Sequence, residues 1–261
     1  MWNWFRAPPC CPLDAVDKEM VETRLQRLAE ALGLKRLREA EVVLPTPTYF
    51  PDPYQGEPDD VRRLLDRVCG YLRIDPTLID MEIYQETLPQ GEYYEAGMET
   101  GCMFEKVGAR FKLWIEAAQC HEPLNLVALM ARELALVDLI GLKQLPLATK
   151  DQEPLAELYT VLLGLGVFTA NAAIYEKYWH ESDGRGDYKL EYRGALTLAQ
   201  YGYALALFAW LRGESKPAWA RELRRDVRTA FTQGLRYLQE DAYALPPSFR
   251  AFVQPRGSGT S

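Results

Sequence analysis

The sequence predicts an α+β fold, with a small, partly antiparallel sheet in the first half of the chain and buried helices in the second half. Segments in which apolar and polar residues alternate lie before residue 118, and helical segments that are apolar on nearly all sides follow residue 123. The 261 residues, of which 48% are hydrophobic, can form a substantial core. We expect a flexible N-terminus over 1–12, one domain over 13–245 and a disordered tail over 246–261.

In the first half, the periodicity of apolar residues defines each expected element. Amphipathic helices are expected over Leu13 to Leu34, where Gly33 supplies a stop signal, and over Asp59 to Leu72. Strands are expected over Ala40 to Leu44, which ends at Pro45, over Ile79 to Glu86, and over Met103 to Val107 and Arg110 to Ala117, which flank Gly108-Ala109 as a hairpin.

The second half is expected to be helical. Helices are predicted over Leu124 to Leu142, from Glu153 to about Trp179, over Leu196 to Arg212 and over Ala218 to Leu238, with a polar loop over residues 180–187. Gly164 and Gly166 indicate close packing of the second of these helices against another helix, and not a break in it. We therefore expect the helices over 124–142 and 153–179 to be adjacent.

Charge and cysteine content exclude several classes of protein. The formal net charge of −7 disfavours nucleic acids and anionic membranes as general partners, although a local basic patch is compatible with it. Five scattered cysteines do not form the pattern of a secreted disulfide framework. The sequence contains neither a signal-peptide pattern nor the ~20 consecutive apolar residues that cross a bilayer, so we expect a cytoplasmic protein.

The first apolar helix of the second half contains the segment Arg132-Glu133-Leu134-Ala135-Leu136. In zinc peptidases with the H-E-x-x-H motif, the two histidines bind the metal and the glutamate activates the bound water as a general base. Here Arg132 and Leu136 occupy the histidine positions, and neither side chain can donate a lone pair to zinc. Only Glu133 remains, so we expect no catalysis, no metal and no other cofactor.

A second element lies downstream, in Asp151-Gln-Glu153-Pro-Leu-Ala-Glu157. It resembles the E-x-x-x-D element of gluzincins, with Glu153 in the place of the third zinc ligand and Glu157 in the place of the aspartate. The runs RELALVDLIG, DQEPLAELYTVLLGLGVFTANA and GYALALFAWLRGE resemble an uncharacterised bacterial family whose members often carry an intact HELxH. This resemblance extends from VVLPTP at residue 42 to about Tyr237. It implies a zincin-like fold, in which an edge strand before the helix binds substrate, and Arg110 to Ala117 has that place in the chain order.

Three functional interpretations follow. The first is a catalytically inactive, metallopeptidase-like domain that acts as a binding or structural protein, with a protein or peptide partner. The second is a hydrolase that uses Glu133, Glu153 and Glu157 with Mg²⁺, Mn²⁺ or Ca²⁺, although Arg132 would place a fixed positive charge in that site. The third is a helical interaction module unrelated to peptidases. We favour the first and expect Arg132 to form a salt bridge with Glu153 or Glu157.

Overall fold

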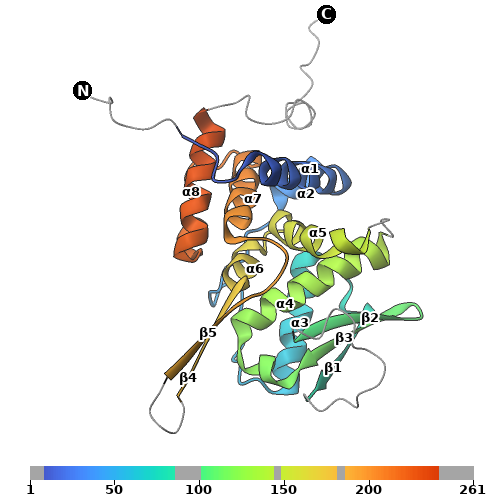
Figure 1. Cartoon of the computed structure of the whole chain (residues 1–261). Coiled ribbons are helices and arrows are strands. Elements are labelled where there is room, and N and C mark those ends of the chain that lie inside the picture. Colours follow the sequence, from blue (N-terminus) through green and yellow to red (C-terminus); the bar gives the residue numbers. More distant parts are fainter. Residues whose placement is uncertain (1–8, 86–100, 144–147, 181–185, 241–261) are drawn as a thin grey trace, which may run out of the picture. The chain divides into compact units, whose positions relative to one another are not determined.

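The computed structural model describes residues 9–85, 101–143, 148–180 and 186–240. The expected disordered tail, and the expected flexible N-terminus except for residues 9–12, lie outside the described residues. The chain divides into two compact units, one formed by residues up to Ala40 together with residues from Thr197 onward, and the other by Glu41–Leu196. Helices and a small three-stranded sheet together make a mixed fold (Figure 1). The single domain over 13–245 stays a prediction, which a fragment experiment can test.

The first unit is helical in its described residues. Its elements are α1 (Ala15–Leu32), α2 (Leu34–Glu39), α7 (Leu198–Leu211), the 3₁₀ turn η5 (Ala218–Glu222) and α8 (Arg225–Glu240). Helix α7 begins with a capping box in which Thr197 and Gln200 bond each other's backbone N–H groups, and it is buried along most of its length. Helix α8 packs closely against α7, because Gly202 has no side chain to clash with Ala230.

The predictions for this unit are confirmed in large part. The helices expected over 13–34 and 196–212 are present as α1 and α7. The helix expected over 218–238 is interrupted, because Leu223 adopts an extended conformation between η5 and α8. The short helix α2 was not predicted; it starts directly after Gly33, whose φ of 80° ends α1.

In the second unit, one long helix and a three-stranded sheet are formed by residues 58–116. Helix α3 (Pro58–Leu72) precedes β1 (Ile79–Tyr84), β2 (Cys102–Val107) and β3 (Arg110–Glu116). The strand order is β1-β3-β2, with β1 parallel and β2 antiparallel to β3, which confirms the partly antiparallel sheet. Phe111, Leu113 and Ile115 form the buried face of β3.

The strand predicted over Arg110 to Ala117 is confirmed as β3, but the edge position that the resemblance implied for it was wrong. Strand β3 is central because β1 pairs with its other side in parallel. Such a pairing of distant segments leaves no signal in local periodicity. Within the described sheet, β2 is the edge strand nearest to β3 in sequence. The strand predicted over Ala40 to Leu44 does not form; the Val43 N–H bonds the carbonyl of Gly164, and Pro45 follows too soon for a ladder to extend.

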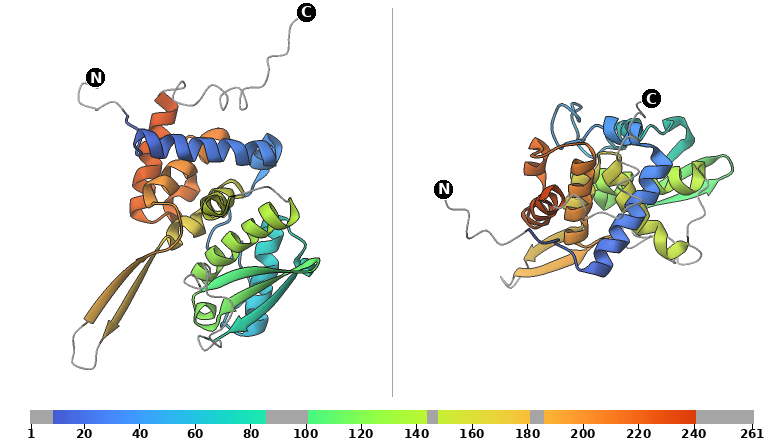
Figure 2. Two further views of the ribbon diagram at one scale, coloured as in Figure 1. Left: turned by 45° about the vertical axis from the view of Figure 1, so that its right-hand side comes forward. Right: turned by 90° about the horizontal axis from the view of Figure 1, so that it is seen from above.

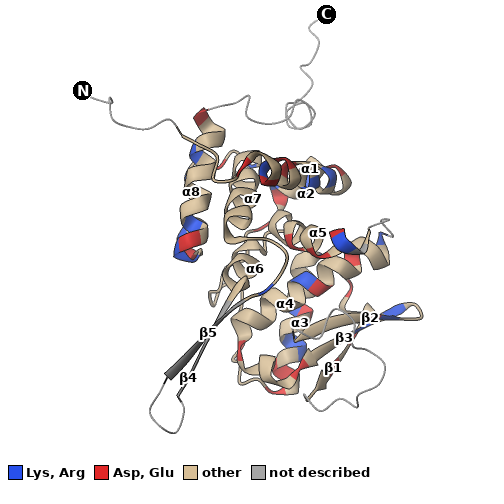
Figure 3. Cartoon of the chain, in the orientation of Figure 1, with Lys and Arg blue, Asp and Glu red and all other residues tan. Residues whose placement is uncertain are grey.

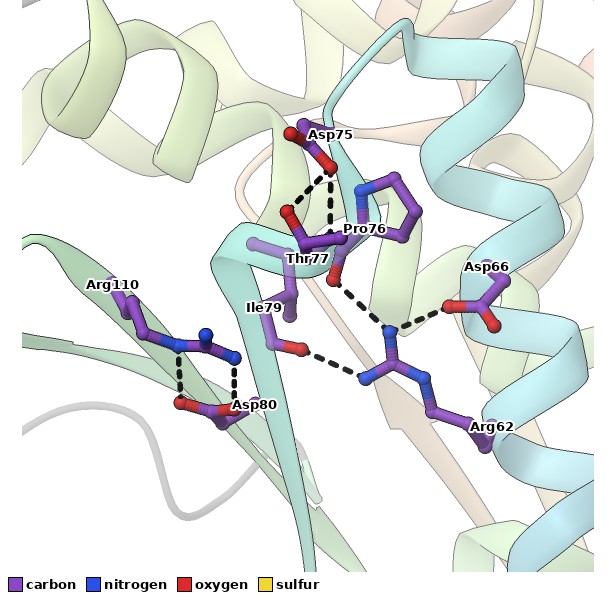
Figure 4. Close-up of polar contacts among 8 residues, drawn as sticks. All are labelled: Arg62, Asp66, Asp75, Pro76, Thr77, Ile79, Asp80 and Arg110. Atoms are coloured by element: carbon purple, nitrogen blue, oxygen red, sulfur yellow. Dashed lines mark hydrogen bonds and ion pairs between the residues drawn. The ribbon is translucent and has the colours of Figure 1, made fainter.

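A set of polar contacts fixes α3 relative to β1 (Figure 4). The guanidinium of Arg62 on α3 donates to the carbonyl oxygens of Ile79 at 2.7 Å and Pro76 at 3.0 Å, and to Asp66 at 2.6 Å. These bonds satisfy carbonyl groups at the start of the strand. Arg110 pairs with Asp80 across β3 and β1, in the same close-up.

The remaining elements of this unit are mainly helical. They are the 3₁₀ turns η1 (Pro76–Leu78) and η3 (Ala117–His121), α4 (Pro123–Leu136), the π-helical turn η4 (Val137–Leu142), α5 (Thr149–Leu162), α6 (Gly166–Ala172), β4 (Ile174–His180) and β5 (Gly186–Tyr192). Helices α4 and α5 are in contact, which confirms the predicted adjacency. The antiparallel strands β4 and β5 form a hairpin that stands apart from the three-stranded sheet (Figure 2).

The helix predicted from Glu153 to about Trp179 was wrong beyond Leu162. Gly164 adopts a φ of +87°, and a Cβ placed there would lie 1.9 Å from the carbonyl oxygen of Glu41. The chain therefore turns at a position that only glycine can occupy, and α6 is a separate helix. The segment Ile174–His180, which is rich in aromatic residues, is a strand and not a continuation of the helix. Of the polar loop expected over residues 180–187, residue 180 belongs to β4 and residues 186–187 belong to β5.

Candidate functional site

The site predicted from the sequence lies on α4, which is the most enclosed helix of the second unit. Pro123 in its first turn has no N–H to leave unsatisfied, and the apolar residues that follow pack against α3, α5, α6 and β2. Every residue from Leu126 to Leu136 is buried. Arg132 and Glu133 are only 6% and 5% exposed to solvent, so two charged groups lie side by side in an apolar environment.

These two charges are paired with each other. The guanidinium of Arg132 donates to Oε1 of Glu133 from Nη2 at 3.0 Å and from Nε at 3.2 Å. The expected salt bridge from Arg132 to Glu153 or Glu157 was therefore wrong as to the partner. The carboxylate of Glu157 is held elsewhere, by backbone groups, and the neighbouring Glu133 is within direct reach of the guanidinium.

Burial opposes both charges of this pair. It acts to lower the pKa of Arg132, but the carboxylates of Glu133, Glu153 and Glu157 outweigh it, and the net shift is upward. Burial raises the pKa of Glu133, and the charge and hydrogen bonds of Arg132 offset only part of that effect. The guanidinium is therefore firmly charged, and it is the group that allows a carboxylate to persist at this depth.

Glu157 on α5 binds the backbone of a distant segment of the same unit. It is 1% exposed, and its two oxygens accept the backbone N–H groups of Ala195 and Leu196, each at 2.9 Å. Gly194 permits this approach, since a Cβ at that position would lie 2.1 Å from Oε1 of Glu157. The glutamate thus anchors the segment that follows β5 to helix α5.

The other predicted residues differ in their surroundings. Glu153 is half-buried on α5 and acts on Arg132 through its charge. Leu136 is buried one turn after Arg132 on α4. The structure thus brings the charges of Arg132, Glu133, Glu153 and Glu157 into one electrostatic cluster, in which the carboxylate of Glu157 also accepts backbone N–H groups after β5.

Two potential metal ligands near this cluster, Glu133 and Cys102, are hydrogen-bonded or kept protonated. One oxygen of Glu133 accepts two bonds from Arg132, and burial raises the pKa of the Cys102 thiol on β2 well above its usual range. Within the described ranges, no group of three or more His, Cys, Asp or Glu residues is placed to hold a metal ion. All five cysteines, Cys10, Cys11, Cys69, Cys102 and Cys120, are free thiols. The absence of a bound metal in solution stays a prediction.

One buried polar network was missed from the sequence. Asp138 in η4 accepts a hydrogen bond from the hydroxyl of Tyr159 at 2.6 Å and pairs with Lys143, whose Nζ also lies 3.0 Å from that hydroxyl. The network joins the end of the α4 region to α5. A single aspartate inside an apolar helix was a visible signal for it, because a buried carboxylate requires a donor.

Comparisons of the chain with protein-family models, curated proteins and solved structures found no match. In the part of the chain that the structure describes, no helix combines the length and apolar character needed to span a bilayer.

Proposed function

We propose that this chain is a zincin-like, catalytically inactive metallopeptidase-like domain that acts as a binding or structural protein. The observation that carries the proposal is the buried pair of Arg132 and Glu133 in the middle of α4. The general-base glutamate of the resembled motif is retained, but its oxygen accepts hydrogen bonds from a fixed cation instead of facing a metal-bound water.

The arrangement of the helices supports the same proposal. Glu153 contributes its charge to Arg132 from α5, the neighbouring helix, as the resemblance to gluzincins implies for the third ligand position. In place of a metal, a guanidinium balances the acidic residues. Its planar geometry and five donors suit carboxylates, and unlike a metal it offers no open coordination position for a water molecule.

The partner in this proposal is a protein or peptide. Strand β2 is an edge strand of the described sheet and contacts α4, and a hydrogen bond from the Phe104 backbone helps to stabilise the carboxylate of Glu133. An edge strand can pair with an extended peptide through main-chain hydrogen bonds. Binding of this kind needs no metal and no general base.

The hydrolase with a non-zinc metal is the weaker candidate. Mg²⁺ and Ca²⁺ require several oxygen ligands, but both oxygens of Glu157 accept backbone N–H groups and Arg132 adds a positive charge beside Glu133. A cation placed there would be repelled by the guanidinium.

Restoring the two helix histidines tests the proposal. We expect purified wild-type protein to contain no stoichiometric zinc by elemental analysis. The double variant Arg132→His, Leu136→His is expected to take up about one zinc per chain, since two histidines and Glu153 complete a three-ligand set. Each single histidine variant is the matched control and should bind zinc far more weakly. Stoichiometric zinc in the wild type, lost on Glu133→Gln or Glu153→Gln, would contradict the proposal even if the double variant did not fold.

A further inference from the structure

Helix α8 in the first unit presents a polar stripe that the proposed function does not use. Its members are Arg225, Arg228, Thr229, Thr232, Gln233 and Arg236, which recur at the spacing of one helix face. Together with Pro9 and Cys10 they line a shallow depression of about 630 Å³, and no Asp or Glu is among these lining residues. In Figure 3 the arginines of α8 lie toward the two ends of the helix, with an uncharged stretch between them. This α8 groove is basic in a chain whose net charge is −7.

Among the described residues, Arg225 and Arg228 of the α8 groove have no carboxylate within 4.0 Å, and Arg236 has one only at that distance. Elsewhere in the described residues, Arg62 pairs with Asp66, Arg63 with Asp60, Arg67 with Asp52, Arg110 with Asp80, Arg212 with Glu214, Arg221 with Glu222 and Arg224 with Asp226. In the groove, Arg228 donates to the carbonyl of Arg221, and Arg236 lies 4.0 Å from Glu240. Arg225 is exposed and has no carboxylate within 4.0 Å among the described residues.

The position of these arginines on the helix also favours the binding of an anion. Arg225 is the first residue of α8 and Arg228 lies one turn later, at the end where the helix dipole is positive. Cations at this end are unfavourable, and an anion bound there would be stabilised by the dipole and by the guanidinium groups together. Arg236 lies about 12 Å further along the axis, at 1.5 Å per residue, so the groove can contact separated anionic groups of one ligand.

We propose that the α8 groove binds a soluble oligophosphate through Arg225, Arg228 and Arg236. Guanidinium groups recognise phosphate oxygens through paired hydrogen bonds. In the middle of the groove, the hydroxyls of Thr229 and Thr232 donate to backbone carbonyls of α8 and the amide of Gln233 donates to Cys10. The arginines are therefore the groups that supply donors to a bound anion. A flat anionic membrane would meet the overall negative charge of the chain and finds no exposed large apolar side chain among the lining residues.

Calorimetric titration of the full chain with inorganic triphosphate tests this binding. We expect saturable binding that weakens as salt concentration rises. The triple variant Arg225→Gln, Arg228→Gln, Arg236→Gln should bind about tenfold or more weakly, because it loses the charge-assisted contacts. The matched control Lys35→Gln, Arg38→Gln, Lys106→Gln changes the net charge equally at exposed positions outside the groove and should bind as the wild type does.

Three results would overturn the proposal: no saturable binding of triphosphate, equal weakening in the control triple variant, or binding only to phosphatidylcholine vesicles that contain phosphatidylserine. Circular dichroism verifies that the variants remain helical. If the triple variant unfolds, the single charge reversal Arg225→Glu decides the matter, since this exposed side chain has no close carboxylate partner among the described residues. It should weaken triphosphate binding, and an unchanged affinity would refute the groove as the site.

Discussion

Glu153 and Glu157 lie one helical turn apart on α5 and differ in what their carboxylates contact. The oxygens of Glu157 are hydrogen-bonded to backbone N–H groups, whereas Glu153 is half-buried and interacts with Arg132 through its charge. The spacing of the two glutamates was readable from the sequence. Their different contacts were not, because the N–H groups of Ala195 and Leu196 are 38 and 39 residues away from Glu157.

This difference predicts unequal effects of the same substitution. Glu157→Gln replaces one acceptor oxygen by an amide that faces a backbone N–H, and we expect a loss of about 1–3 kcal/mol in the free energy of unfolding. Glu153→Gln, the matched control, should change it by less than about 0.5 kcal/mol. Chemical denaturation of both variants measures this, and equal losses would show that the bonds to Ala195 and Leu196 do not stabilise the fold.

A second residue-scale prediction concerns Glu22 on α1, in the first unit. The Tyr203 hydroxyl donates to its Oε1 at 2.6 Å and Lys18 lies 3.3 Å away, but burial still raises the pKa of Glu22. A carboxyl group whose pKa is higher in the folded than in the unfolded state stabilises the fold at low pH. This contribution is fully present below the unfolded pKa of about 4.3 and is lost as pH rises through the folded pKa.

Glu22→Gln removes this titration. The free energy of unfolding of the variant, minus that of the wild type, should therefore increase as pH rises from about 4 to 7. Denaturation at a series of pH values measures the difference, with Glu19→Gln as an exposed control on the same helix. A difference that stays constant or decreases over this range would contradict the assigned direction of the shift.

At the scale of elements, periodicity predicted most helices and strands but not where a periodic pattern stops. Helices α1, α3 and α7 and the strands β1, β2 and β3 correspond to predicted segments. Helix α5 ends early because the carbonyl of Glu41 approaches Gly164, and that contact comes from a segment more than 120 residues earlier in the chain. The order of the strands was likewise set by the long-range pairing of β1 with β3.

The break between α5 and α6 can be tested through that glycine. Gly164→Ala would place a methyl group against the carbonyl of Glu41 at a positive φ, and we expect a loss of more than about 1 kcal/mol in the free energy of unfolding. Gly108→Ala is the control, because Gly108 also has a positive φ but no atom lies near the added Cβ. Its loss measures the conformational cost alone, and the additional loss at Gly164 measures the clash. A smaller loss at Gly164 than at Gly108 would count against the close contact.

At the scale of the whole molecule, the sequence predicted a mixed helix and sheet fold and the burial of the helix that carries the candidate site. The buried second-half helix that carries Arg132 and Glu133 was expected, as was its contact with the following helix. The partner of Arg132 was not, because adjacent side chains on a helix do not normally face each other, yet the guanidinium of Arg132 reaches Glu133. Division of the chain into two units was also not foreseen, since residues 9–40 and 197–240 join across a long sequence separation.

A fragment experiment tests this organisation. Residues Glu41–Leu196 form a continuous segment with its own sheet, helices and buried residues. We expect the isolated fragment to fold, with a cooperative thermal transition and the circular dichroism of a mixed helix and sheet protein. A fragment that remains unfolded, while the full chain melts cooperatively, would favour the single domain over 13–245.

The central claim is that Arg132 compensates the buried charge of Glu133 in a site without a metal, and a double-mutant cycle tests it most directly. Breaking a buried ion pair from one side typically costs about 3–5 kcal/mol, so Arg132→Met and Glu133→Gln should each strongly lower the free energy of unfolding. The double variant should lose much less than the sum of the two, whereas the exposed pair Lys35→Met and Glu39→Gln should be additive. Strictly additive losses at Arg132 and Glu133 would contradict the claim.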